Sequence, residues 1–281
     1  MSQSTAIVLG GTEDHILLIE NLKSRGYKTI LCDYLDNPPA KSFADLFIRE
    51  SILDYEKILE ISKKYKADLV LTVCIDQAIP VMAAVSKVLN LPCYLTVSQS
   101  IAFTNKVLMK RKMIEADIPC ASFQIVNIRD LDNLPIDNFN YPLIIKPSDT
   151  NSSKGVIRIN GPEQFINSFG YVASFSRSGD LVVEEYMIGK EYSLDFILIN
   201  GSPILISHSQ LRKSSMLMDR FIINRCTMPS DLSTTALNSI YDFACKISEF
   251  YQYINGPLLI QVIVNQDDVK VIEFSCRVGG G

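Results

Sequence analysis

The chain has 281 residues, of which 47% are hydrophobic and 21% charged, with a formal net charge of −4 and an isoelectric point near 5.3. This composition indicates a globular protein with room for two cores and excludes a disordered chain. Because there is no broad basic field, no nucleic-acid partner is expected, and we interpret the run Lys106, Lys110, Arg111 and Lys112 as a solvated helix face. No apolar run approaches the ~20 residues of a membrane-spanning helix, so no membrane partner is expected.

The first part of the chain alternates between strand and helix patterns. Apolar runs end in turn residues, and the segments between them carry apolar residues at helical spacing. The predicted strands are 5–10, 28–33 and 68–73, and the predicted helices are 14–25, 55–65 and 77–89. Strands that alternate with helices in this way predict a parallel α/β sheet.

A glycine turn, Gly10-Gly11, follows the first predicted strand. Glycines let a phosphate approach the N-terminus of a helix, but the GxGxxG fingerprint is absent, and Glu13 and Asp14 stand where a phosphate would lie. We therefore favour a structural turn, or part of an acceptor-substrate pocket, over a dinucleotide site.

The pattern changes after the turn-rich segment 95–104, so we expect an N-terminal α/β domain over 1–95 and an α+β domain over 96–281. Helices are predicted at 106–116, 161–169 and 232–250. Strands are predicted at 122–127, 143–146, 155–159, 181–185, 192–199, 203–209, 258–264 and 269–274.

Two neighbouring segments of the second domain suit the binding of phosphate. The apolar strand at 143–146 delivers Lys146 at its end, and an inward lysine is costly unless an anion meets it. The loop 149–155 is rich in small polar residues and ends in Gly155, so its backbone N–H groups and hydroxyls can fold over phosphate oxygens. Considered alone, a lysine at the end of a strand is more often simply exposed to solvent, and a loop of this kind is more often a hairpin connection.

The segment 183–195 suits adenosine. An apolar strand ends in Glu184 and Glu185, a short linker follows, and Glu191 comes seven positions after Glu184. Backbone groups of the linker can read the edge of adenine, and Glu191 can accept from both ribose hydroxyls. A charged hairpin is the alternative interpretation.

Two alternating strands, 259–264 and 271–275, are joined by a turn of polar residues. Gln261, Glu273 and Ser275 therefore lie on one face of a predicted antiparallel pair. Carboxylate and amide oxygens, completed by phosphate oxygens and water, suit Mg²⁺. Arg277, just beyond, suits a transferring phosphoryl group.

Together these features resemble the ATP-grasp superfamily over the whole chain. The first domain is similar to the preATP-grasp domain, which also occurs in biotin carboxylase and the carbamoyl phosphate synthase large subunit. The ending Arg277-Val-Gly-Gly-Gly281 resembles that of carboxylate-amine ligases, including L-amino acid ligases.

The resemblance implies roles for individual residues. Lys106 and Lys146 would contact ATP phosphates under a mobile lid of Ser152, Ser153, Lys154 and Gly155, within a lid subdomain over about 115–185. Glu184, Glu185, Tyr186 and Met187 would form the adenine hinge, and Glu191 would bind the ribose. Gln261, Glu273 and Ser275 would hold Mg²⁺ or Mn²⁺, and Arg277 and Lys146 would act in catalysis. His208 is interpreted as an edge-strand histidine more readily than as a nucleotide-facing one.

The activity that the resemblance implies is ATP-dependent activation of a carboxylate as an acyl phosphate, followed by attack of an amine. The alternatives are phosphorylation of bicarbonate, as in carbamoyl phosphate synthase, an ATP-binding protein that has lost catalysis, and an α/β protein that binds no nucleotide. Small carboxylate and amine substrates are the expected partners, and a homodimer is left open.

Two departures from the family pattern stand out. Ser275 stands where many of these ligases carry Asn, and its shorter side chain is less suited to binding a second metal ion. Relatives usually continue well beyond the glycine run, so we expect either a truncated chain or one without the acceptor side of the site.

The seven cysteines are scattered singly among apolar neighbours, with no CxxC pair and no signal peptide before the first predicted strand. This favours reduced core thiols in the cytoplasm. Cys276 lies beside the candidate catalytic motif but has no base near it in sequence, so a core thiol is favoured there too.

Overall fold

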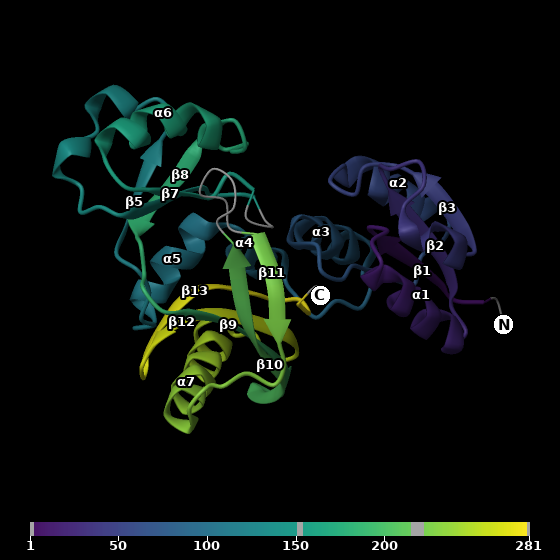
Figure 1. Cartoon of the computed structure of the whole chain (residues 1–281). Helices are drawn as coiled ribbons and strands as arrows, with labels where there is room; N and C mark the ends of the chain where they lie inside the picture. Colours follow the sequence, from purple (N-terminus) through teal and green to yellow (C-terminus); the bar gives the residue numbers. More distant parts are fainter. Residues whose placement is uncertain (1–2, 151–153, 215–221, 280–281) are drawn as a thin grey trace. The chain divides into compact units, whose positions relative to one another are not determined.

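The structure is a computed structural model, and it describes residues 3–150, 154–214 and 222–279. The chain divides into two compact units (Figure 1). The first unit contains the chain up to Thr104 and the segment that begins at Cys276, and the second runs from Asn105 to Ser275. No helix among the described residues is long and apolar enough to cross a membrane.

The first unit is built on a four-stranded parallel sheet in the order β3-β2-β1-β4. Its strands are β1 (Thr5–Leu9), β2 (Lys28–Asp33), β3 (Leu46–Arg49) and β4 (Leu69–Leu71). Its helices are α1 (Asp14–Ser24), α2 (Tyr55–Lys64), α3 (Ile79–Leu89) and α4 (Val97–Thr104). The residues of β1 are all buried, as expected of a central strand in a parallel sheet. The predicted parallel α/β region is confirmed.

Two elements of this unit differ from the sequence-based expectation. The segment 95–104 was expected to be rich in turns, but most of it is helix α4, which buries Ser100 and Phe103 and packs against α3. The short strand β3 was not expected, because its side chains are only partly buried at the edge of the sheet and show no clear alternation.

The second unit contains a five-stranded antiparallel sheet in the order β11-β10-β9-β12-β13. Its strands are β9 (Lys190–Ile199), β10 (Ser202–Ser214), β11 (Ile222–Thr227), β12 (Gly256–Asn265) and β13 (Asp268–Ser275). Helix α7 (Thr234–Tyr251) packs against one face of this sheet (Figure 1), where the Tyr251 ring meets Phe274 of β13 at 5.6 Å between centroids.

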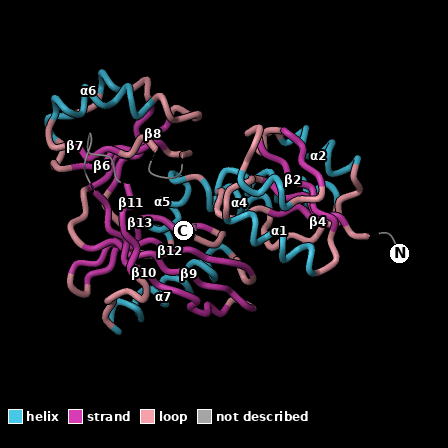
Figure 2. The backbone as a smooth tube through the Cα atoms, turned by 45° about the vertical axis from the view of Figure 1, so that its right-hand side comes forward, coloured by secondary structure: helices cyan, strands magenta, loops and turns pink. Residues whose placement is uncertain are grey.

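The second unit also contains a smaller, four-stranded antiparallel sheet in the order β5-β8-β6-β7. Its strands are β5 (Phe123–Asn127), β6 (Leu143–Pro147), β7 (Ile157–Ile159) and β8 (Asp180–Glu185). Helix α6 (Pro162–Ala173) covers one face through a core that includes Ile145, Leu181 and Phe165 (Figure 2). Helix α5 (Lys106–Glu115) precedes this sheet in the chain.

Both sheets of the second unit therefore have one apolar face covered by a helix and one face that carries polar side chains. Along β9, Tyr192, Leu194 and Phe196 are buried, whereas Glu191, Ser193 and Asp195 are only partly buried. In a strand, alternate residues point to opposite faces, so the period of two in the sequence separates the core from the candidate site.

Candidate functional site

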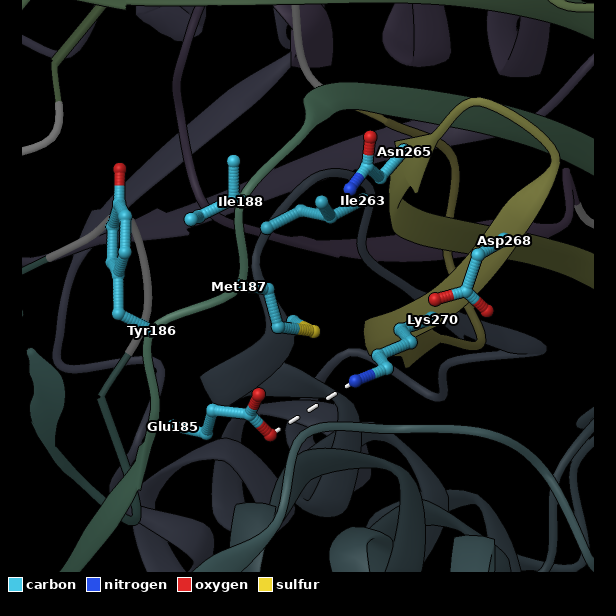
Figure 3. A pocket seen from close by; sticks show the side chains of 8 residues that line it. All are labelled: Glu185, Tyr186, Met187, Ile188, Ile263, Asn265, Asp268 and Lys270. Atoms are coloured by element: carbon cyan, nitrogen blue, oxygen red, sulfur yellow. Dashed lines mark ion pairs between the residues drawn. The ribbon is translucent and has the colours of Figure 1, made fainter. Parts of the chain in front are cut away.

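A pocket of about 200 Å³ lies beside the linker between β8 and β9. Glu185, Tyr186, Met187 and Ile188 form one side of it. The other side consists of Ile263 and Asn265 from β12 and Asp268 and Lys270 from β13. Figure 3 shows the Lys270 side chain directed toward Glu185, and the two are 3.9 Å apart. Since ligand pockets usually measure about 300–1,000 Å³, this one fits one part of a nucleotide, such as the base.

Gly189 holds the linker close to β12. Its φ of 156° is in a range that other residues rarely adopt. A Cβ atom at this position would lie 2.6 Å from the carbonyl oxygen of Val264. A glycine is therefore required for the close approach that shapes this side of the pocket.

Three charged side chains are buried together at the polar face of the smaller sheet. Glu184 of β8 is 4% exposed, and its carboxylate forms a hydrogen-bonded ion pair with Lys146 of β6. The second carboxylate oxygen lies 2.8 Å from the ammonium of Lys110 on α5. Burial alone would raise the pKa of Glu184, but the charges of Lys146 and Lys110 outweigh it and lower the pKa to about 2.

The lysine run on α5 was interpreted as a solvated face, and for Lys110 this was wrong. The Lys110 side chain is 2% exposed, and Met109 and Met113 are buried on the same helix. Lys106 and Lys110 are one turn apart, so they lie on the same side of the helix. Lys112, in contrast, is 40% exposed and pairs with Glu115.

Gln261 and Glu273 lie directly opposite each other on β12 and β13, and Ser275 lies opposite Leu259. Gln261 also faces Ser193 on β9, so these side chains share the polar face of the larger sheet. The Glu273 side chain is 36% exposed, and its carboxylate lies 3.6 Å from the ammonium of Lys106. Ser275 is 7% exposed.

Glu191 lies on the same face of the larger sheet and is 2.6 Å from the ammonium of Lys213 on β10. Burial raises the pKa of Glu191 above its usual value, and the negative charge of Glu273 adds to this effect. Lys213 and Lys146 act in the opposite direction. Glu273 and Lys146 thus lie close enough to Glu191 to act on its carboxylate.

The donors around Glu273 fit a magnesium ion that is shared with phosphate. Among the described residues, no group of three or more His, Cys, Asp or Glu side chains is arranged to hold a metal ion. Mg²⁺, however, is usually bound through only one or two carboxylates together with phosphate oxygens and water. One partly exposed carboxylate opposite an amide oxygen suits that arrangement.

The loop 149–155, which the sequence predicts to cover phosphate, is described only in part, and Ser152 and Ser153 lie outside the described residues. Before them, the carbonyl oxygen of Thr150 accepts a hydrogen bond from the Lys106 ammonium. After them, Lys154 is exposed, and Gly155 has a φ of 72°. A Cβ atom on Gly155 would lie 2.9 Å from Pro147, so the loop returns close to the end of β6.

Arg277 belongs to the first unit and forms a two-pronged ion pair there with Asp76. Its Nε and Nη2 atoms each donate to a carboxylate oxygen of Asp76 at 2.8 Å. The Tyr94 hydroxyl donates to the carbonyl oxygen of Cys276, which fixes the same segment. The structure thus assigns Arg277 to a different unit from Lys146 and Glu273.

The Gly10-Gly11 turn is a packed structural turn. The Gly11 N–H donates to Asp33 at 2.8 Å, and a Cβ atom on Gly11 would lie 2.6 Å from Pro38. His15 is fully buried, its ring contacts the Thr12 hydroxyl and the Leu9 carbonyl, and burial lowers its pKa. The Gly11 N–H, a donor of the kind that binds phosphate, thus already has a partner within the protein.

Several charged residues of the site were not identified from the sequence. Lys110, Lys213 and Lys270 each pair with an acidic residue that was identified. The sequence held a local indication that Lys110 is buried, because it lies beside the apolar residues Met109 and Met113 on the same helix. The pairings of Lys213 and Lys270, in contrast, depend on strand register.

His208 lies opposite Leu194, on the α7 side of the sheet, where its ring contacts the Ser230 hydroxyl at 2.7 Å.

The fold and these contacts define a two-part α/β protein whose second unit combines a small pocket with clustered lysines and acids. A family model described as an ATP-grasp domain matches residues 139–281. Since this match covers half of the sequence, the chain belongs to the ATP-grasp domain family.

Individual relatives are more distant. The phosphoribosylamine–glycine ligase of Streptococcus suis is 25% identical over 190 residues, which cover 62% of this chain and 45% of that protein. The L-amino acid ligase of Bacillus licheniformis has a TM-score of 0.81 at 18% identity, over 100% of this chain and 68% of that one. The N5-carboxyaminoimidazole synthetase of Staphylococcus aureus, complexed with ADP, has a TM-score of 0.77 at 17% identity, over 99% and 71% of the two chains. The chain thus spans less than half of the curated relative's length.

Proposed function

We propose that this chain binds ATP with Mg²⁺ and activates a carboxylate as an acyl phosphate, which an amine or a similar nucleophile then attacks. The observation that carries the proposal is that one unit brings together two lysines, Lys106 and Lys146, and two carboxylates, Glu191 and Glu273. A pocket large enough for a nucleotide base lies beside them. The names of the relatives, which are ligases, support the same class of reaction.

Different residues would bind the different parts of ATP and the metal ion. The linker at Glu185 to Ile188 would receive the base, and Glu191 would accept hydrogen bonds from the ribose hydroxyls. Lys146 and Lys106 would neutralise phosphate oxygens, with Ser152, Ser153, Lys154 and Gly155 as the covering loop. Glu273 and Gln261, with Ser275 beside them, would hold Mg²⁺, which supplies charge neutralisation to the phosphates when it is bound.

No protein nucleophile is required for this chemistry. Transfer of a phosphoryl group depends mainly on positioning and on stabilisation of charge, which fixed lysines provide. The role that the family resemblance implies for Arg277, stabilisation of the transferring group, stays a prediction, because Arg277 belongs to the first unit and pairs there with Asp76. Exclusion of water by the loop would protect an acyl phosphate from hydrolysis.

The test is calorimetric titration of ATP into the full chain, with and without Mg²⁺. We expect Mg²⁺-dependent binding by the wild-type protein. Glu191→Ala should weaken binding roughly tenfold or more with or without the metal, because the ribose hydroxyls lose their acceptor. Glu273→Gln should remove the gain in affinity that Mg²⁺ gives. Glu249→Gln, an exposed position on α7, is the matched control and should bind as the wild type does.

Release of phosphate in the presence of panels of carboxylates and amines then tests the reaction. Release that depends on both substrates would support the ligase proposal. ATP binding without release for any carboxylate would restrict the function to nucleotide binding. A folded wild-type protein that binds no ATP would contradict the proposal altogether.

A further inference from the structure

The cluster of Lys110, Glu184 and Lys146 contains two positive charges and one negative charge. The exposed fractions of the three side chains are 2%, 4% and 5%, so water screens them little. Buried charges are costly unless they are matched by partners. The cluster therefore carries an excess positive charge that the protein holds in a dry environment.

Neighbouring acids do not cancel this excess. Glu191 is matched by Lys213, and Glu273 is matched by Lys106. The thiol of Cys120 also lies near the cluster, and burial raises its pKa, which keeps it neutral. The ammonium of Lys110 also lies over the ring of Phe123, 5.8 Å from its centroid.

The geometry divides the cluster into a supporting side and a binding side. Lys110 approaches one oxygen of Glu184 from helix α5, and Lys146 approaches the other oxygen from β6. Phe123, Glu184 and Ile144 are aligned across β5, β8 and β6, which fixes the carboxylate in the middle of the sheet. Lys146 lies near the end of β6, shortly before the loop 149–155, and its charge acts on Glu191, whereas Lys110 is buried with its ammonium over the ring of Phe123.

We propose that Lys110 is a positioning residue, which satisfies the charge of Glu184 so that the charge of Lys146 stays available to a polyphosphate anion. This inference rests on the proposed function. Without Lys110, Glu184 and Lys146 would form a neutral one-to-one pair, and Lys146 would have to leave that pair in order to contact phosphate. Lys110 thus acts on the phosphates through Glu184 and Lys146 and not by contact.

The experiment compares the binding of ATP and of adenosine by the full-length wild-type protein and three variants. Lys110→Met keeps the length of the side chain and removes its charge. Lys110→Met combined with Glu184→Gln removes one charge of each sign, which restores the net charge of the cluster. Lys112→Met removes an exposed lysine from the same helix and is the matched control.

For Lys110→Met, we expect the affinity for ATP to fall roughly tenfold or more and the affinity for adenosine to change by less than about twofold. The double variant should regain most of the affinity for ATP, because Lys146 is again the uncompensated charge. Lys112→Met should leave both affinities unchanged. Thermal unfolding of each variant shows whether the protein is folded.

Distinct outcomes would overturn the inference. If Lys110→Met weakened ATP and adenosine equally, or if the double variant bound ATP no better than the single one, Lys110 would have a structural role only. Unchanged ATP affinity in folded Lys110→Met would also overturn it. A wild-type protein that binds no ATP would instead contradict the proposed function, and the positioning role with it.

Discussion

At the scale of single residues, Glu184 has an unusual environment for a carboxylate. Its side chain is 4% exposed, yet two lysines keep it ionised because both oxygens face an ammonium group. Such an arrangement is rarely a source of net stability, since the cost of desolvation offsets much of the attraction between the charges. A role in organising the charges of a binding site accounts for it better.

The low pKa of Glu184 predicts how stability changes with pH. In the folded protein this pKa is about 2, below the ordinary value of 4.5. Stability contributed by Glu184 is therefore complete above about pH 4.5 and is lost as the pH falls toward 2. In chemical unfolding experiments between pH 5 and pH 2.5, Glu184→Gln should show a shallower decrease in the free energy of unfolding than the wild type.

Other carboxylates titrate in the same range, so a control is needed. Glu249→Gln, at an exposed position, should keep the pH dependence of the wild type. Equal slopes for Glu184→Gln and the wild type would mean that Glu184 titrates normally and that the two lysines do not hold it ionised.

At the scale of elements, the linker between β8 and β9 connects the two sheets of the second unit. It follows Glu184 and Glu185 on the smaller sheet and precedes Glu191 on the larger one. The ion pair of Glu185 with Lys270 also joins the sheets, and the N–H of Val271 on β13 donates to the carbonyl oxygen of Pro119 in the segment before β5. The shape of the pocket therefore depends on a short backbone segment that Gly189 allows to lie against β12.

We predict that Gly189→Ala lowers the free energy of unfolding by about 1–3 kcal/mol, because the new Cβ would collide with Val264 and the backbone would be strained. It should also weaken ATP binding. Gly170→Ala is the matched control, since Gly170 is in helix α6 with open space around it, and it should stabilise the protein by about 0.5–1 kcal/mol. Chemical unfolding measures both, and a harmless Gly189→Ala would contradict the role of the close approach.

At the scale of the whole molecule, the chain returns to its first unit at its end. Arg277 and Gly279 contact Asp76 and Cys74, and Cys276 contacts Tyr94, all within that unit. Asp76 and Arg277 are separated by 201 positions in sequence, so their pairing constrains the path of the chain after β13.

A double-mutant cycle with Asp76→Asn and Arg277→Gln should give a coupling energy of about 1–3 kcal/mol, since the pair is two-pronged and its side chains are only 19% and 16% exposed. Thermal and chemical unfolding of the two single variants and the double variant measure this energy. Additive effects of the two substitutions would show that the pair does not help to hold the segment.

Some of these features follow from the sequence because they depend on local periodicity. The strand and helix patterns of the first part predicted a parallel sheet, and alternation along 259–264 and 271–275 predicted a pair of strands with one polar face. Most predicted elements are confirmed within a few residues. Those missed are the partly buried edge strand β3, helix α4 and strand β11, whose burial patterns depend on what packs beside them.

The residues of the candidate site likewise fall into those that the sequence identified and those that it did not. Lys146, Glu184, Glu191 and Glu273 were found from the sequence because each stands at a marked position in a strand or motif. Their roles in the site stay predictions until binding is measured. Their partners could not be found, because ion pairs such as that between Glu191 and Lys213 depend on strand register.

The sequence by itself thus determined the class of fold, the family resemblance and the acidic and basic residues at strand ends, since these depend on short segments with a regular period. Only the tertiary structure decided that Lys110 is buried against Glu184 and that Arg277 pairs with Asp76. Both pairs join residues that are far apart in the chain, and the free energy of such contacts depends on burial and distance in the folded protein, which no local pattern encodes.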